Sequence, residues 1–91
     1  MKVHIPTPLR SYTHTSIVDA NGATLAELLI DLDRQFPGLR FRIVNEQDEL
    51  REQIKLFVNQ RIARSLDEPL NSNDALRIIM AISGGASARK P

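Results

Sequence analysis

Two adjacent glycines near the C-terminal end are the residues of this chain that most suggest chemistry. Gly84 and Gly85 follow the last apolar segment, and residues 86–91 come after them. Because glycine has no side chain, a Gly-Gly pair can pass through a narrow channel and approach a partner's backbone closely. Residues 83–91 contain no large apolar side chain, so we expect residues 84–91 to form a flexible tail. A terminus that contains two glycines without any function would show the same pattern.

The remaining candidate groups predict no active site. The chain has no cysteine, which excludes disulfides, thiolate metal sites and cysteine nucleophiles. His4 and His14 could meet across a hairpin, but no third ligand stands at a recognisable spacing, so we expect surface histidines and no bound metal. Two carboxylate pairs are candidates: Asp31 with Asp33 on a predicted helix, and Glu49 with Glu52 after it. No cleft can be argued around either pair, so we interpret them as solvated charges rather than as a general acid and base.

The size and composition of the chain are those of one small globular domain. It has 91 residues, and its 12 Lys and Arg nearly balance its 11 Asp and Glu. This balance argues against a nucleic-acid-binding protein, which would concentrate basic residues on one face. No apolar run approaches the roughly 20 residues that span a bilayer, and the N-terminus lacks the apolar stretch of a signal peptide. We therefore expect a cytoplasmic protein that binds no membrane and no nucleic acid and is a monomer when alone.

The clearest element is a helix predicted over residues 24–35. Thr24 and Glu27 have the spacing of a capping box, in which each side chain accepts a hydrogen bond from an amide of the first turn. Apolar residues then recur at helical spacing on one face: Leu25, Leu28, Leu29, Leu32 and Phe36. This pattern predicts a helix that buries one face and ends at Pro37 and Gly38.

Alternating polar and apolar residues predict strands on both sides of this helix. Residues 2–5 and 16–19 are expected to form a hairpin, with a turn region at residues 9–15 between them. A further strand is predicted at residues 54–59, and a short one would fit within residues 60–63.

The last strand is predicted at residues 76–82 and follows a loop at residues 66–74. It is apolar on both faces apart from Arg77, which indicates a central position in a sheet. Residues 39–52 are heavily charged, and we interpret them as a short helical turn followed by a loop. The economical arrangement is α+β: residues 1–83 form one domain with a mixed sheet of four or five strands and one main helix packed across it.

Several segments together resemble the MoaD/ThiS family of ubiquitin-like sulfur carriers, which have the β-grasp fold. Residues 5–10 look like the first strand of that family and its exit, and residues 36–39 look like the end of its helix. Residues 50–51 and 56–59 resemble the segment that enters and forms its third strand. Residues 76–85, which end in Ser-Gly-Gly, look like its last strand and diglycine tail.

The resemblance implies a protein cosubstrate rather than an enzyme. A ubiquitin-activating-type enzyme would use ATP and Mg²⁺ to adenylate the carboxylate of the last glycine, and a sulfurtransferase would convert that end to a thiocarboxylate. A sulfur-accepting synthase would then build the sulfur into molybdopterin, the thiamin thiazole, cysteine or another metabolite. Carried onto this sequence, Gly85 is the terminus that is modified and Gly84 is its neighbour in the channel. The carrier itself is expected to bind no cofactor.

The residues after Gly85 depart from the simplest pattern of the family. With Ala86 joined to it, Gly85 has an amide carbonyl in place of a free carboxylate and cannot be adenylated directly. The resemblance to extended family members implies cleavage between Gly85 and Ala86 by a JAMM-type zinc metalloprotease. The alternative is a permanent extension on a chain without carrier function.

A docking surface is expected beside the tail. Phe57 of the strand at residues 54–59 would point away from the helix, as would Arg77, Ile79 and Ala81 of the last strand. If the two strands are neighbours, Phe57 and Ile79 form an exposed apolar patch, and such patches often mark partner sites. In the alternative interpretation, the loop within residues 40–52 covers Phe57 and Ile79.

Two other functions fit the same features. The chain could be the small subunit of molybdopterin synthase, with Gly85 inserted into the active site of the large subunit. It could also be a ubiquitin-like interaction module that binds partners without covalent activation.

Overall fold

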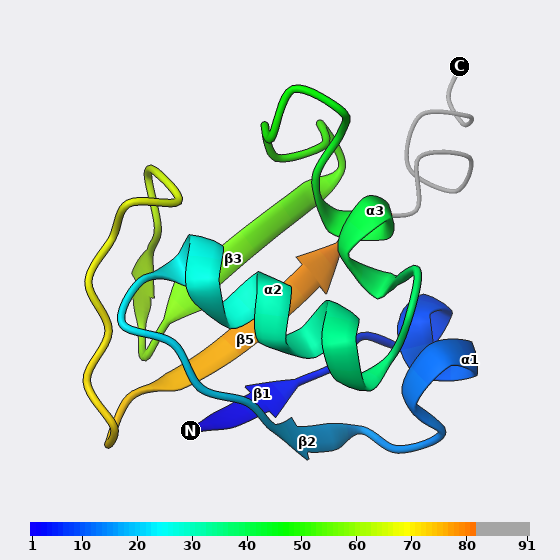
Figure 1. Cartoon of the computed structure of the whole chain (residues 1–91), viewed down its shortest axis with the longest axis horizontal. Helices are drawn as coiled ribbons and strands as arrows, with labels where there is room; N and C mark the ends of the chain where they lie inside the picture. Colours follow the sequence, from blue (N-terminus) through cyan, green and yellow to red (C-terminus); the bar gives the residue numbers. More distant parts are fainter. Residues whose placement is uncertain (82–91) are drawn as a thin grey trace.

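The computed structural model describes residues 1–81, which form a five-stranded mixed sheet with helices on one face (Figure 1). The strand order is β2-β1-β5-β3-β4. The strands are β1 (Lys2–His4), β2 (Ile17–Asp19), β3 (Ile54–Val58), β4 (Arg61–Ile62) and β5 (Ala75–Met80). The helices are a 3₁₀ turn (Thr7–Leu9), α1 (Arg10–Thr13), α2 (Leu25–Gln35) and α3 (Leu39–Ile43). The predicted α+β architecture is confirmed, and the predicted tail at residues 84–91 lies outside the described residues.

Helix α2 lies across the sheet and supplies much of the core (Figure 1). Its four leucines on the predicted stripe are fully buried: Leu25, Leu28, Leu29 and Leu32. Thr24 is the N-cap, and its Oγ1 accepts a hydrogen bond from the Glu27 amide at 3.3 Å. The Glu27 carboxylate accepts from the Ala23 amide at 3.0 Å, one residue before the amide expected from an ideal capping box. The helix therefore begins and ends where the sequence predicts.

Strand β5 is central, as its apolar sequence predicts. It pairs in parallel with β1 and antiparallel with β3. Leu76 and Ile78 are buried under α2, and Met80 packs against the same core. The last strand therefore occupies the middle of the sheet.

The segment between β1 and β2 differs from the predicted turn region. It forms the 3₁₀ turn and then the single helical turn α1, which ends at His14 in a left-handed conformation with φ 59°. Pro8 suits the first turn of a helix because it has no N–H to leave unpaired. One turn is too short to produce a helical repeat of apolar residues, so the sequence pattern contained no signal for it. Its consequence is that Leu9 and Thr13 are buried beside the end of the sheet.

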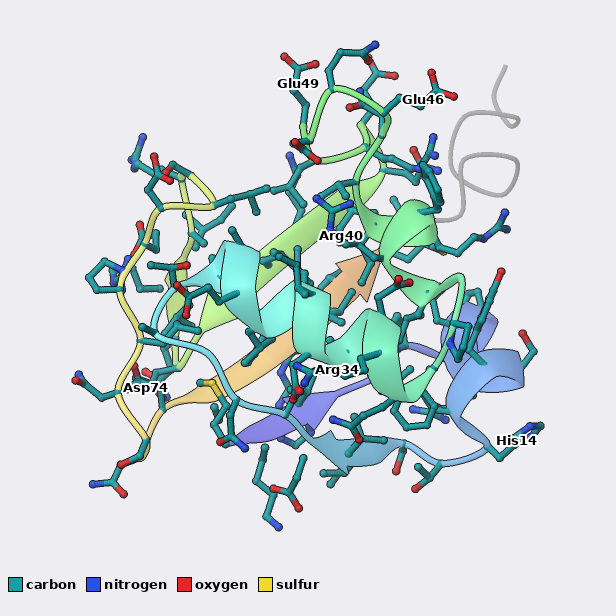
Figure 2. The ribbon with its side chains drawn as sticks, viewed as in Figure 1. His14, Arg34, Arg40, Glu46, Glu49 and Asp74 are labelled. Atoms are coloured by element: carbon teal, nitrogen blue, oxygen red, sulfur yellow. The ribbon has the colours of Figure 1, made fainter. Side chains whose placement is uncertain are left out.

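The charged region after α2 follows its prediction. Helix α3 is the short helical turn, and residues 44–53 form a loop that is closed by a β-bridge between Val44 and Leu50. Figure 2 shows Glu46 and Glu49 projecting outward from this loop. No helix within residues 1–81 is long and apolar enough to cross a membrane.

The loop before β5 gives a prediction about stability and pH. Asp74 accepts hydrogen bonds from the Asn71 amide at 2.9 Å and from the Asn59 side chain at 3.0 Å, and these bonds lower its pKa. Because the pKa is lowered in the folded state, the stabilisation exists above the unfolded-state pKa of about 3.9 and is lost as pH falls through the folded value. Asp74→Asn should therefore lower the urea midpoint at pH 7.

The difference in urea midpoint between the wild-type chain and Asp74→Asn should shrink as the pH falls from 7 toward 3. Below about 3.9 the carboxyl group of the unfolded wild-type chain takes up a proton more readily than that of the folded chain, whose pKa is lowered. Urea unfolding curves at both pH values measure this directly. An equal difference in midpoint at pH 7 and pH 3 would contradict the assigned role of the carboxylate.

Candidate functional site

The face of the sheet turned away from α2 carries the residues predicted to dock a partner. In the register of β3 and β5, Phe57 lies opposite Arg77 and Lys55 lies opposite Ile79. Residues that are directly opposite in an antiparallel pair point to the same face, so all four share the outer face. Ala81 is exposed just beyond β5, and its amide donates to the Gln53 carbonyl at 2.8 Å.

One row of side chains crosses the outer face over all five strands. It runs from Ile17 on β2 through His4 on β1, Arg77 on β5 and Phe57 on β3 to Ile62 on β4. The side chain of Phe57 is half-buried between its neighbours, whereas Ile17 and Ile62 keep 43% and 39% of their surface exposed. This row therefore has an exposed isoleucine at each end and Arg77 at its centre.

The exposure of Ile79 distinguishes the two interpretations of this surface, which are an exposed apolar patch and a patch covered by the loop within residues 40–52. Ile79 keeps 39% of its surface exposed, so the loop within residues 40–52 does not cover it. Phe57 is half-buried on the same face, one diagonal step away. The structure thus places Phe57 of β3, Arg77 and Ile79 of β5, and Ala81 just beyond β5 on or beside the outer face. Gly84 and Gly85 lie outside the described residues.

A groove of about 510 Å³ lies beside this surface, between the exit of β1 and the end of β5. Its lining includes Pro6, Arg10, Ile17, Arg77 and Met80. Arg10 is not among the predicted site residues, because the sequence of residues 9–15 indicates a turn region. The sequence signal for this groove is the pair of prolines at positions 6 and 8, because they end β1 early and leave space beside β5.

The carboxyl groups with perturbed pKa values lie away from the outer face. The side chain of Arg61 donates a hydrogen bond to Glu68 at 2.7 Å, and this bond, with a second from the Arg64 amide, lowers the pKa of Glu68. Asp74, described above, lies at the start of β5 (Figure 2). Glu68 ties its loop to the edge strand β4, and Asp74 ties the loop before β5 to the turn after β3, so both have a structural role.

The two histidines lie on different elements. His4 lies in the row on the outer face, whereas His14 ends α1 and projects outward (Figure 2). Residues 1–81 hold no cluster of three or more His, Asp or Glu side chains suited to a metal ion. The carboxylate pairs also lie apart from the outer face: Asp33 accepts from the amides of Gly38 and Arg40, and Asp31 pairs with Arg34 at 2.9 Å.

Comparisons with known proteins match nearly the whole chain. The sequence model of the ThiS family matches residues 3–85. The sulfur carrier protein CysO of Mycobacterium tuberculosis is 29% identical over 89 residues, covering 91% of this chain and 96% of the relative. Both glycines lie within the stretch that the family model matches.

Solved structures show the same similarity. A chain in the crystal structure of the BexX/CysO complex of Amycolatopsis orientalis is 33% identical, with a TM-score of 0.85, over 92% of this chain and 98% of that one. Small archaeal modifier protein 1 from Methanosarcina acetivorans is 26% identical, with a TM-score of 0.79, over 92% and 94% of the two chains. This chain therefore belongs to the ThiS/MoaD family of ubiquitin-like sulfur carriers, and it has their β-grasp fold.

Proposed function

We propose that this chain carries sulfur as a thiocarboxylate at Gly85, after proteolysis has removed residues 86–91. The proposal rests on the end point of the match to the ThiS family model. The match runs from residue 3 through both glycines and stops at Gly85, before residues 86–91. In the sequence, Gly84 and Gly85 come four and five residues after Met80, the last residue of the central strand β5, and neither has a side chain.

The chemistry requires activation because a carboxylate is a poor electrophile. In the proposed sequence, a carboxylate oxygen of Gly85 attacks the α-phosphorus of ATP and pyrophosphate leaves. The terminal sulfur of a sulfurtransferase persulfide then attacks the carbonyl carbon, AMP leaves, and an acyl disulfide forms. A thiol of the partner enzyme attacks the enzyme-side sulfur of that disulfide, which releases the thiocarboxylate and leaves a disulfide between the two enzyme thiols. A covalent intermediate of this kind divides one difficult step into two easier ones. ATP and Mg²⁺ belong to a ubiquitin-activating-type enzyme, and the chain itself is a cosubstrate.

Cleavage between Gly85 and Ala86 must precede activation, because only cleavage creates the carboxylate. A JAMM-type metalloprotease is the proposed processing enzyme. A sulfur-accepting synthase that builds a cofactor, an amino acid or another small metabolite is the proposed consumer of the thiocarboxylate.

Intact-mass spectrometry of the protein recovered from its own host tests the proposal. The expected result is a species that ends at Gly85, with a fraction of molecules carrying sulfur in place of one oxygen. A full-length species alone, even when the cells are starved of sulfur, would overturn both processing and sulfur carriage.

The outer face around Phe57 and Ile79 is the proposed docking surface for the activating enzyme, with Arg77 and Ala81 beside it. Phe57→Ser should weaken binding by about tenfold or more, because removing an aromatic anchor from an interface commonly costs over 1 kcal/mol. Calorimetric titration of the activating enzyme with the chain that ends at Gly85 measures the loss.

Ile30→Ser is the control for this prediction, since Ile30 keeps 54% of its surface exposed and lies on α2, which covers the other face of the sheet. It should bind like wild type. Equal affinities for Phe57→Ser and Ile30→Ser would remove the outer face from the proposed interface.

A further inference from the structure

The parallel ladder between β1 and β5 stops before β5 does. β1 pairs with β5 only as far as the His4–Arg77 pair, whereas β3 pairs with β5 up to Met80. The next step of the parallel ladder would need the amide of residue 6 to donate to the Ile78 carbonyl, and Pro6 has no N–H. Among residues 1–81, the stretch of β5 from Ile78 to Met80 therefore has a paired strand on one side only, and the groove lies on its other side.

The backbone groups that face this groove can be identified from the hydrogen bonds at both ends of β5. The Ala81 amide donates to Gln53, and the Ala75 carbonyl accepts from Asn59, so the odd-numbered residues of β5 bond toward β3. Successive residues of a strand turn their N–H and C=O groups to opposite sides, so Ile78 and Met80 point theirs toward the groove.

The hydrogen bonding of Ile54, the β3 residue opposite Met80, agrees with Met80 pointing its backbone groups away from β3. The Ile54 amide donates to the Arg51 carbonyl at 2.9 Å instead of bonding across to Met80. Within residues 1–81, neither the Met80 amide nor the Ile78 carbonyl has a partner on this side, so both could bond to an added strand. An unpaired stretch of strand edge is a template for pairing with another extended chain.

The charges around the groove determine which chain would fit. Arg10, Arg77 and His4 line it, and no Asp or Glu does. Neither arginine forms an ion pair within residues 1–81. The Nε of Arg10 donates to the Ile5 carbonyl at 3.0 Å, which holds the guanidinium over the groove and leaves its other N–H donors available. Ile17 and Ile79 add apolar surface.

We propose that an extended acidic segment of a partner protein binds in this groove as an added strand beside Ile78–Met80. Its backbone would bond to the Ile78 carbonyl and the Met80 amide, its carboxylates would pair with Arg10 and Arg77, and its apolar side chains would contact Ile17 and Ile79. Residues 82–91 are a poorer occupant, since their charged side chains are Arg89 and Lys90. A second copy would bring the same arginines face to face.

The inference rests on the proposed function only for the identity of the partner, which is the activating enzyme. It can therefore be tested on the full chain alone, with a probe of the stated chemistry. The probe is an acetylated seven-residue peptide in which Asp or Glu alternates with Val or Ile, and the matched control peptide carries Asn and Gln in place of the acids.

Amide hydrogen exchange measured by NMR distinguishes an added strand from side-chain docking. Saturating acidic peptide should slow exchange of the Met80 amide by about tenfold or more, while the Ile79 amide, which already bonds toward β3, should change little. Unchanged exchange at Met80 with the peptide bound would overturn strand addition. Protection of Met80 in the concentrated chain without peptide would assign the groove to a second copy, and it would also overturn the proposal.

Arg77→Gln tests the charge requirement, and Arg64→Gln is its control because Arg64 is an exposed arginine outside the groove. Arg77→Gln should weaken binding of the acidic peptide two- to fivefold at low salt, the usual size of an exposed ion pair, and should flatten the salt dependence. Equal binding of the acidic and neutral peptides, or equal loss in the two variants, would overturn the acidic specificity.

Adenylation assays separate this inference from the proposed function. If the peptide adds as a strand but the activating enzyme does not adenylate the chain that ends at Gly85, the groove assignment stands and the proposed function fails. If adenylation proceeds but the peptide does not bind at millimolar concentration, the groove assignment fails and the proposed function stands.

Discussion

A chain that ends at Gly85 is expected to be adenylated by a ubiquitin-activating-type enzyme, and the 91-residue chain is expected to give no adenylate. The reason is chemical: in the longer chain the Gly85 carbonyl is part of an amide, which offers no carboxylate oxygen to attack ATP. ATP–pyrophosphate exchange measures the reaction directly, with each chain added in turn to the same enzyme. This is the largest effect that the proposed function predicts.

A chain that ends at Gly84 is the control for this comparison. It has a free carboxylate, but its end falls short by one residue, roughly 3.5 Å. A displacement of this size should reduce adenylation by about 100-fold or more, because catalysis depends on the position of the reacting group. Equal exchange with the Gly84 and Gly85 chains would show that any free terminus suffices. Exchange with the uncleaved 91-residue chain would show that processing is not required.

The second large effect concerns the core under α2. Leu28 is fully buried between α2 and the sheet, so Leu28→Ala should lower the free energy of unfolding by about 3 kcal/mol through lost burial and the cavity left behind. A domain of this size has a total stability on the order of 5–10 kcal/mol, so the loss is a large fraction. Urea unfolding should show a lower midpoint with an unchanged slope.

Ile30→Ala is the matched control, two residues along the same helix. Ile30 keeps 54% of its surface exposed, and alanine favours the helix, so the stability should change by less than about 0.5 kcal/mol. A loss below about 1 kcal/mol for Leu28→Ala would contradict the packing of α2 on the sheet.

The regular elements could be predicted because their sequence patterns are local. Helix α2 combines an N-cap at Thr24, an apolar stripe and a stop at Pro37, and each signal lies within one turn of the next. The sequence predicts that β5 is central in the sheet, because it is apolar on both faces apart from Arg77, and the structure confirms this position. Alternation along β3 and β5 also predicted that Phe57 and Ile79 share a face.

Features that depend on short or irregular backbone could not be predicted in the same way. Helix α1 is a single turn, so it has no repeat that a sequence pattern could reveal. The row from Ile17 to Ile62 requires the register of four strand pairings, and register depends on which strands are neighbours.

By itself, then, the sequence determined helix α2, the strands, the α+β class and the diglycine at positions 84 and 85, because each depends on residues close together along the chain. Only the tertiary structure decided that Ile79 stays uncovered and that β1 leaves β5 at Pro6. The tertiary structure also brings Arg10 and Arg77, which are 67 positions apart in the sequence, to the same groove. These features arise where distant segments pack together, and local patterns of hydrophobicity do not encode such contacts.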